Sequence, residues 1–355
     1  MHNNKTVNLI TSHIKRAGKR YALDALSAMA LGLFSSLIIG TILEQIGKFI
    51  PSLSFLIPFA TMAKAPQVVG GTIGISIAWG LKVSPLAMFS SAISGALGYQ
   101  MGGPLCCYLS ALIGAELGNL ITGKTKVDII VVPCFTIIFG GLVAIFSSPI
   151  VNALMNALRA FIDTATTLQP IPMGIIVSVV VGLTLTAPIS SAALCAMIFA
   201  VPDGATLGTG LELAAGAATA GCCAQMVGFA CCSYKENKMS GLIAQGLGTS
   251  MLQVPNILMH PLILIPPTLA AAIVGPLSTT LFSMKNVGVF AGMGTSGLVG
   301  QIGTFQTMLQ TESLWLVAFK VILLHIALPA IISIFSASYM KKKGWIGCND
   351  MKLSL

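Results

Sequence analysis

Residues 49–81 read FIPSLSFLIPFATMAKAPQVVGGTIGISIAWGL, in which two apolar runs are separated by a short polar interruption. The runs Phe49–Met62 and Val68–Leu81 are each shorter than the roughly 20 residues that a helix needs to cross a bilayer. Lys64–Gln67 lies between them. Short apolar segments interrupted by Pro and Gly are typical of the discontinuous helices around transport sites. Gln67 is therefore a candidate polar contact for a transported solute.

The whole chain shares the apolar character of this stretch. Of its 355 residues, 55% are hydrophobic and 8% are charged, and the mean hydropathy is +0.91. A soluble domain carries about 25% charged residues, so this chain has too few to cover a surface that faces water. The composition predicts an all-α polytopic membrane protein and excludes disordered chains, disulfide scaffolds and nucleic-acid-binding modules.

The net charge of +9 is explained by where the basic residues lie. Many of them precede the first apolar run or follow the last one: Lys5, Lys15, Arg16, Lys19, Arg20, Lys341, Lys342 and Lys343. Basic residues beside spans mark cytoplasmic flanks, so both termini are predicted to be cytoplasmic and the number of crossings to be even. The expected anionic partner is the lipid of the inner leaflet, not nucleic acid.

Three segments are expected along the chain. Residues 1–20 carry apolar side chains at helical spacing among basic ones, which predicts a cytoplasmic amphipathic segment on the membrane surface. Residues 21–340 form the membrane domain, whose first span is expected at Ala22–Leu43. Residues 341–355 form a short cytoplasmic tail.

About ten transmembrane helices are expected in the membrane domain. Further spans are predicted at Pro85–Gly98, Pro104–Ile121, Ile129–Phe146, Ser240–Val254, Ile257–Val274 and Ser313–Phe335. Residues 149–168 differ, because polar residues recur there on one helical face: Asn152, Asn156, Arg159 and Asp163. This pattern predicts an interfacial or bundle-capping helix that divides the chain roughly in half.

Residues 203–232 are rich in Gly and Ala, and a span or a re-entrant hairpin fits them equally well. Glu212 is the only charged residue between Asp203 and Lys235. Its carboxylate could accept hydrogen bonds from sugar hydroxyls, and Gln225, thirteen residues further on, could line the same pocket. The alternative for Glu212 is a hydrogen-bonded acid of the protein core.

A short repeat lies in the second half of the chain. Gly246–Ser250 reads GLGTS and recurs as GMGTS at Gly292–Ser296. Repeated broken segments are a feature of transporters, although a chance match among small residues is the alternative. Such turns would place backbone amides and hydroxyls at membrane depth, so Thr295, Ser296 and the nearby Gln301 are candidate solute contacts.

Three more ionisable residues interrupt apolar segments. Glu116 lies within a predicted span, where an ionisable group indicates function unless it is neutralised. Its alternative is a place near the cytoplasmic end of that span, where Lys124 and Lys126 would neutralise it. His260 lies in a proline-broken segment and is a candidate ligand contact, with a structural role as the alternative. His325, in the last span, is a weaker candidate of the same kind.

No catalytic set of residues is present in the sequence. The chain has no plausible Ser–His–Asp set, no H-E-x-x-H and no P-loop lysine motif, which excludes ATP-driven transport within this chain. The nine cysteines lack the spacing of a zinc site and are expected to be small buried hydrophobes. Gly292–Gly297 matches a dinucleotide-binding fingerprint, but no βαβ unit surrounds it. No metal or cofactor is expected.

Four stretches carry a resemblance to a known family. They are Lys64–Gly71 (KAPQVVGG), Gly114–Gly118 (GAELG), Cys222–Phe229 (CCAQMVGF) and Gly294–Gln301 (GTSGLVGQ). With these motifs the chain resembles the membrane (IIC) component of bacterial sugar phosphotransferase systems, in particular its PfoR-type branch. The resemblance covers nearly all of residues 20–340.

The resemblance implies a homodimer in the bacterial inner membrane, with about ten helices, amphipathic connecting helices and re-entrant hairpins. It implies an elevator transporter that presents a sugar, polyol or sugar acid to a IIB protein in trans. A glutamate and a histidine contact the sugar in better-known branches, and the resemblance relates them to Glu212 and His260. The motif around Glu212 departs from the usual pattern, and the phosphoryl-carrying domains are absent from this sequence. A membrane-bound sensor or regulator, and a secondary transporter independent of phosphorylation, are therefore the alternatives.

Overall fold

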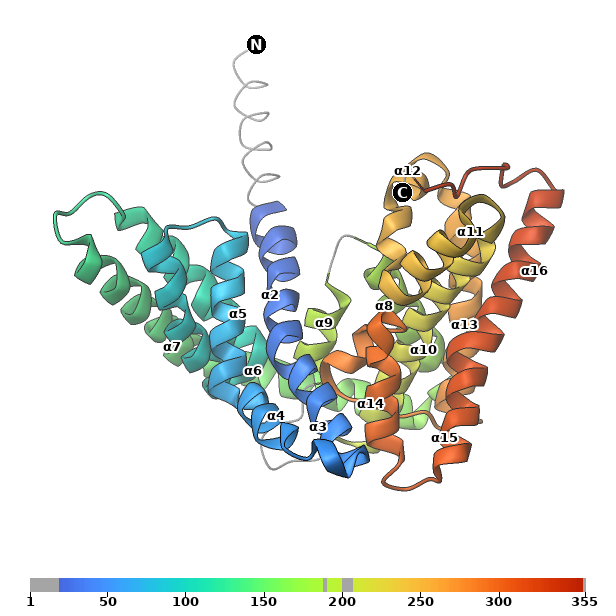
Figure 1. The fold of residues 1–355 in the computed structure, drawn as a ribbon, viewed down its shortest axis with the longest axis horizontal. Helices are drawn as coiled ribbons and strands as arrows, with labels where there is room; N and C mark the ends of the chain where they lie inside the picture. The colour runs from blue at the N-terminus through green and yellow to red at the C-terminus, as the bar shows by residue number, and fades with distance from the viewer. Residues whose placement is uncertain (1–18, 188–189, 200–206, 354–355) are drawn as a thin grey trace, which may run out of the picture. The chain divides into compact units, whose positions relative to one another are not determined.

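The computed structural model describes residues 19–187, 190–199 and 207–353, and within these ranges the regular structure is entirely helical (Figure 1). Most of the amphipathic segment predicted at residues 1–20 lies outside them, as does Asp203. Six helices in the described ranges are long and apolar enough to cross a membrane. Pro170–Thr186 is a shorter apolar helix. The prediction of an all-helical membrane protein is confirmed.

The chain divides into two compact units, Met1–Leu154 and Met155–Leu355. The first contains the helices α2 (Leu26–Leu33), α3 (Ile39–Phe49), α4 (Leu56–Lys64), α5 (Pro66–Gly80), α6 (Pro85–Ile121) and the first part of α7 (Asp128–Leu168). The second contains the rest of α7, followed by α8 (Pro170–Thr186), α9 (Ser191–Ile198), α10 (Thr209–Cys232), α11 (Tyr234–Ile243), α12 (Val254–Met259), α13 (Ile265–Thr279), α14 (Val299–Met308), α15 (Leu314–Val321) and α16 (Leu328–Lys342). The boundary lies inside the predicted dividing helix.

Small residues hold α5 against α6 in the first unit. A Cβ added at Gly74 would collide with the backbone of Ser91, and one at Gly70 would meet Tyr99 and the backbone near Gly95. Because lipid does not drive helices together as water does, close backbone approach is a main source of packing energy in a membrane. Gly70 belongs to the Lys64–Gly71 motif, so part of that motif serves helix packing.

A break divides α6 into the two spans that the sequence predicts. Gly102 and Gly103 have non-helical backbone angles, and Gly103 has φ of +67°, a conformation that glycine adopts without steric cost. The two halves fold back on one another, since the hydroxyl of Ser110 donates to the carbonyl oxygen of Ser94 at 2.7 Å. The predicted interruption between residues 98 and 104 is therefore confirmed.

The structure joins two predicted elements in the single helix α7, which runs from Asp128 to Leu168. At 1.5 Å per residue its 41 residues extend for about 60 Å, roughly twice the hydrocarbon thickness of a bilayer. The prediction of a separate helix at 149–168 is therefore wrong in its N-terminal boundary.

Three of the four polar residues on that predicted face bind the backbone near helix ends. Asn152 donates to the carbonyl oxygen of Met101 beside the break in α6, at 3.0 Å. Arg159 donates to the carbonyl oxygens of Met197 and Ile198 around the end of α9, and Asp163 accepts from the amide of Leu211 in the first turn of α10. Backbone groups at helix ends have no partner within their own helix, so these side chains satisfy them.

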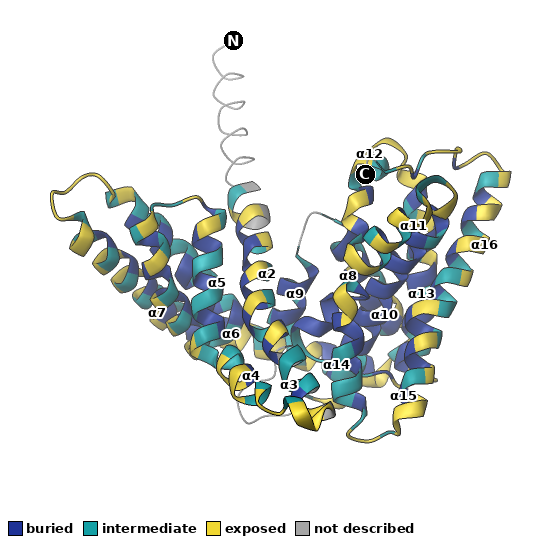
Figure 2. Cartoon of the chain, viewed as in Figure 1, coloured by how far each residue is buried: buried dark blue, intermediate teal, exposed yellow. Residues whose placement is uncertain are grey.

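The second unit is built around α10, which is almost wholly buried (Figure 2). Helices α8, α13 and α16 pack against it. Glycines allow the close approach, because a Cβ at Gly221 would overlap the backbone of Ser178 in α8, and one at Gly228 would press on Pro267 in α13. Of the two alternatives for residues 203–232, the structure gives one continuous helix from Thr209, not a hairpin.

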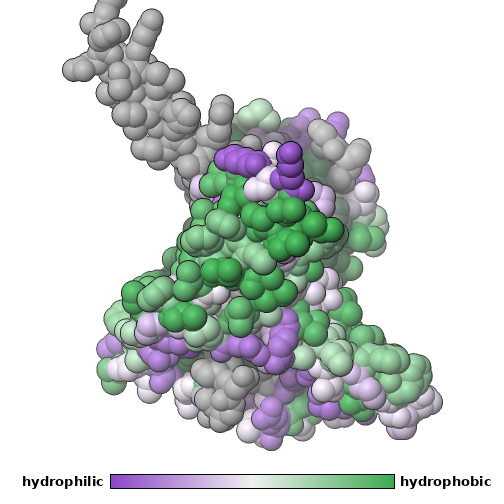
Figure 3. Space-filling view, turned by 90° about the vertical axis from the view of Figure 1, so that its left-hand side faces the viewer, coloured by the Kyte–Doolittle hydropathy of each residue, from purple (hydrophilic) through white to green (hydrophobic). Residues whose placement is uncertain are grey.

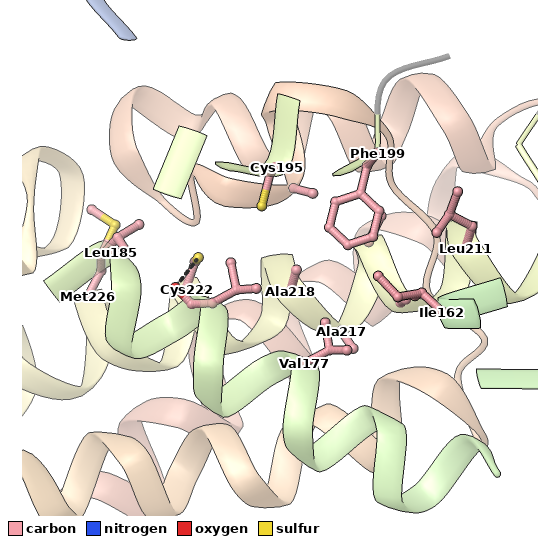
Figure 4. Packing of buried hydrophobic residues seen from close by; sticks show 14 residues of the cluster. Ile162, Val177, Leu185, Cys195, Phe199, Leu211, Ala217, Ala218, Cys222 and Met226 are labelled. Atoms are coloured by element: carbon pink, nitrogen blue, oxygen red, sulfur yellow. Dashed lines mark hydrogen bonds between the residues drawn. The ribbon is translucent and has the colours of Figure 1, made fainter. Parts of the chain in front are cut away.

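Side chains from α8, α9 and α10 meet in an apolar cluster of the second unit (Figure 4). It consists mainly of Ile162, Val177, Val181, Leu185, Cys195, Phe199, Leu211, Ala217, Ala218, Cys222 and Met226. Cys195 and Cys222 are buried there, as expected of the cysteines. Cys134 and Cys348 are exposed, so the expectation of burial is wrong for these two. All nine cysteines are free.

Broken backbone follows α13 in the second unit. The chain passes through two short 3₁₀ turns, Gly288–Gly292 and Ser296–Leu298, before α14 begins at Val299. Positive φ angles occur at Gly288, Gly294, Gly297 and Leu298. A side chain at Gly294 would also collide with the backbone of Cys222 and Cys223 in α10. We call residues 286–304 the broken segment.

Apolar side chains remain on the outside of the molecule. Figure 3 shows a broad apolar area on the face it presents. On α7, Ile129, Ile138 and Phe146 are exposed. Apolar surface of this extent is unfavourable in water but suits contact with lipid or with another membrane protein.

Candidate functional site

One side of α10 contacts the broken segment, residues 286–304. Thr219, Cys223 and Met226 are spaced at i, i+4 and i+7, so they share a stripe along the helix. Thr219 contacts Asn286, Cys223 contacts Gln301 and Met226 contacts Thr295. The candidate site consists of this stripe, the broken segment and the part of the last membrane helix that packs against them.

Asn286 anchors one part of the broken segment. Its buried side-chain amide donates to the hydroxyl of Thr219 at 2.8 Å, to the carbonyl oxygen of Gly300 at 3.0 Å and to the hydroxyl of Thr304 at 3.3 Å. Irregular backbone is tolerated at membrane depth only where protein groups or an aqueous cavity satisfy it. The sequence analysis missed Asn286, although a lone amide beside an apolar run was a usable signal.

Gln301 and His325 lie in contact in the interior of the second unit. The amide nitrogen of Gln301 is 3.3 Å from Nδ1 of His325 and donates to Sγ of Cys223, also at 3.3 Å. His325 is fully buried, and Gln301 is 6% exposed. Oε1 of Gln301 and Nε2 of His325 nevertheless make no hydrogen bond within the protein. Buried polar atoms nearly always have partners, so these two atoms make this part of the second unit a candidate site.

The helix geometry around His325 is also irregular. Residues Ile322–Ala327 form π-helical turns between α15 and α16. A π-turn widens the helix locally and is found frequently at functional sites. His325 was the weaker candidate from the sequence, in which a π-turn leaves no clear mark.

The two repeated motifs of the sequence meet in space. The hydroxyl of Thr295, in the second copy, donates to the carbonyl oxygen of Gly246, in the first copy, at 2.5 Å. The turns that contain them, Ala244–Gly248 and Ser296–Leu298, lie side by side. Thr295 is 3% exposed, and Ser296 is half-buried. The repeat thus joins two irregular turns beside the stripe of α10.

Gln225 lies on another side of α10 and has its own partners. It accepts a hydrogen bond from Thr186 at 3.2 Å and donates to Thr268 at 3.1 Å. The hydroxyls of Thr186 and Ser250 are 2.9 Å apart. Because both ends of its amide are bonded, Gln225 connects α8, α10 and α13 in the form seen here.

Glu212 lies in the first turn of α10 and forms an ion pair with Lys285 at 3.0 Å. The sequence analysis missed Lys285 as its partner. Thirteen residues along a helix correspond to about 20 Å, so Glu212 and Gln225 do not line one pocket. The expectation that they share a pocket is therefore wrong.

His260 contacts the C-terminal part of the chain. Its side chain is 46% exposed, and Nδ1 lies 3.7 Å from a carboxylate oxygen of Asp350. The two atoms form an ion pair only when the imidazole is protonated.

Gln67 and Glu116 belong to the first unit. Gln67 is exposed in the first turn of α5. Glu116 is paired with Arg20 at 2.7 Å, so its partner is not one of the two lysines that the sequence suggested. Burial alone would lower the pKa of Arg20, but its hydrogen bond and charge attraction to Glu116 outweigh burial and raise it.

The structure thus brings Thr295, Ser296 and Gln301 together in one cluster beside α10 and adds His325. Within the second unit, Glu212, Gln225 and His260 contact other residues. The groups of the cluster are hydroxyl, amide and imidazole, which recognise neutral polar groups by hydrogen bonds. Within the described ranges, no three His, Cys, Asp or Glu side chains lie close enough to hold a metal ion.

Comparison with known proteins gives one match. A family model described as "Phosphotransferase system, EIIC" matches residues 23–353, which is nearly the whole chain. A search of curated proteins and a search of solved structures found no match.

Proposed function

The chain belongs to the EIIC family of the phosphotransferase system, and from this premise we propose that it carries a sugar, polyol or sugar acid across the membrane. We propose that the solute binds in the second unit, between the broken segment, α10 and His325. The family match makes the chain a membrane permease component that works with other proteins of the phosphotransferase system.

The unpaired atoms of Gln301 and His325 carry this proposal. When Nδ1 of His325 accepts from the amide of Gln301, the neutral imidazole carries its proton on Nε2. The site then offers a donor, Nε2–H, and an acceptor, Oε1 of Gln301. A hydroxyl group complements both, because it can accept one hydrogen bond and donate another. Solutes with several hydroxyls fit this chemistry.

Access to the site requires the broken segment to move, because Gln301 and His325 are buried. The broken segment contains two short turns and four residues at positive φ, so its backbone is irregular. We propose that it opens during an elevator motion of a homodimer. Hydrogen bonds join the broken segment to Thr219 of α10 and to Gly246. These bonds support motion of the second unit as a rigid body, in which only the short turns of the broken segment change conformation.

Phosphorylation of the solute is assigned to a IIB protein in trans, since the sequence contains no catalytic set. We place the protein in a bacterial inner membrane with both termini in the cytoplasm, in accordance with the basic residues at its ends. Under this proposal the chain supplies solute binding and passage, and its partner supplies the chemistry.

The test begins with a panel of sugars, polyols and sugar acids added to the detergent-purified protein. A ligand that binds only the folded state raises the unfolding temperature, so the panel identifies the solute. Uptake of that solute into proteoliposomes is then measured with and without IIB and its phosphoryl donors. Uptake that needs IIB supports the proposal, whereas uptake without IIB favours a secondary transporter. Binding without uptake under either condition favours a sensor of the PfoR type.

A further inference from the structure

Residues 344–353 pack on the second unit as an irregular segment, which we call the C-terminal segment (Figure 1). It follows α16, which ends at Lys342. Ile346 and Met351 are buried in a cluster that includes Phe229 and Ile263. The sequence predicts only a short tail here, but the segment has its own anchor points.

Side-chain amides bind the backbone of this segment. Asn237 donates to the carbonyl oxygen of Met351 and accepts from the amide of Leu353, both at 2.8 Å. Gln253 also donates to the carbonyl oxygen of Met351, at 3.0 Å. Asn256 donates to the carbonyl oxygen of Lys352 at 3.0 Å.

This arrangement has the chemistry of peptide recognition. The amide group of Asn237 offers one donor and one acceptor, and both engage main-chain groups two residues apart. Main-chain hydrogen bonds provide affinity without regard to sequence, and side chains in pockets provide specificity. Met351 is the side chain that the site buries, whereas Lys352 is exposed.

We propose that Asn237, Gln253 and Asn256 form a peptide clamp whose occupant is the chain's own C-terminal segment, and that the occupied clamp restrains the broken segment. This inference goes beyond the proposed transport function and does not depend on the identity of a solute.

The restraint follows from a chain of contacts. Gln253, which binds Met351, also donates to Oε1 of Gln245 at 2.8 Å. Gln245 is fully buried and donates to Ser233 and Gly241, which fixes the turn that contains it. The next residue, Gly246, accepts the hydrogen bond of Thr295 in the broken segment. Release of the segment would remove one support of this turn.

The test compares two full-length variants, each with one substitution, at neighbouring positions. Met351→Asp places a charge in the buried cluster and should release the segment, while Lys352→Ala removes an exposed side chain and keeps the bonded backbone. Hydrogen exchange is followed by mass spectrometry at residues 244–256 and 293–301. We expect Met351→Asp to accelerate exchange in both regions by about tenfold or more, because exchange follows local opening, and Lys352→Ala to leave it unchanged.

A synthetic peptide of residues 343–355 completes the test. Added to the Met351→Asp protein, it should bind the vacant clamp and slow exchange in both regions again. Failure of the peptide to restore protection would overturn the clamp, and unchanged exchange at 293–301 in Met351→Asp would overturn the restraint. Should that variant fail to fold, Asn237→Leu removes two of the backbone hydrogen bonds from the side of the clamp. Exchange in both regions should then accelerate, and the added peptide should not slow it, because its main binding side chain is missing; slowed exchange with the peptide would overturn the role of Asn237.

Discussion

Two helices of this protein, α7 and α10, reverse the rule that governs soluble proteins. In the most apolar stretch of α7, 22% of the residues are buried. In the corresponding stretch of α10, which is less apolar and rich in Gly and Ala, 94% of the residues are buried. In water the more apolar helix would be the buried one. Here the apolar side chains of α7 suit contact with lipid or with another membrane protein, and α10 is buried because its small residues let other helices approach. In such a protein, burial reports close packing and polar contacts more than hydrophobicity.

The largest effect is expected from adding one methyl group to α10. Gly221→Ala would press a Cβ against the backbone of Ser178, which cannot yield as a flexible side chain can. We expect the free energy of unfolding to fall by about 3 kcal/mol, the upper part of the usual range for overpacking. Thermal unfolding in detergent measures the change.

Gly141→Ala in α7 is the matched control for that variant. The nearest atom to its added Cβ is Cδ1 of Leu97 at 3.6 Å, an ordinary contact. We expect the unfolding free energy to stay within about 1 kcal/mol of wild type, with a small gain from helix propensity. Equal losses in the two variants would refute the contrast between the two helices.

A second test replaces buried and exposed asparagines. Asn286→Leu removes three hydrogen bonds that hold the broken segment, so we expect a loss of about 2 to 3 kcal/mol in unfolding free energy. Asn156→Leu changes an exposed residue of α7 and should alter stability by less than about 0.5 kcal/mol. Chemical denaturation in mild detergent compares them, and a strongly destabilised Asn156→Leu protein would show that this exposed side chain contributes to the fold.

The smallest effect is expected in the first unit, at the pair of Arg20 and Glu116. Both side chains are partly exposed, so solvent screens their attraction and Glu116→Gln should cost less than about 1 kcal/mol. Because the ion pair with Arg20 accounts for a carboxylate at this position without any contact to a solute, solute uptake by Glu116→Gln should match wild type. Uptake assays in proteoliposomes check this, and strongly reduced uptake with normal stability would place Glu116 in the transport path.

The sequence analysis succeeded where the signal is local. The predicted spans Pro85–Gly98 and Pro104–Ile121 left the break in α6 between them, and the dividing stretch predicted at 149–168 contains the boundary between the two units. It failed where partners are distant along the chain. Glu116 meets Arg20 across 96 residues, and His325 meets Gln301 through a π-turn. Such pairings depend on how helices pack, which periodicity and composition do not contain.

The candidate site shows the same contrast between local sequence signals and contacts that are distant along the chain. Thr295 and Gln301 could be selected because they lie in a Gly-rich break, which is visible in the sequence. Asn286 and Lys285 could not be assigned partners, because the contacts of each depend on how the broken segment folds against α10. Gln225 was selected for its polarity in an apolar stretch, but in this structure its amide binds Thr186 of α8 and Thr268 of α13.

The central claim is that the unpaired atoms of Gln301 and His325 bind the solute. The most direct test is the double variant Gln301→Leu/His325→Leu, assayed for the rise in unfolding temperature that the identified solute produces. Replacing both partners of a buried hydrogen bond by apolar side chains costs little stability, because no polar group of the pair is left unpaired. The ligand-free unfolding temperature of the double variant should therefore stay close to wild type. The account predicts no rise on adding solute to this variant and a normal rise in the Gln67→Leu control. A normal rise in the double variant would contradict it.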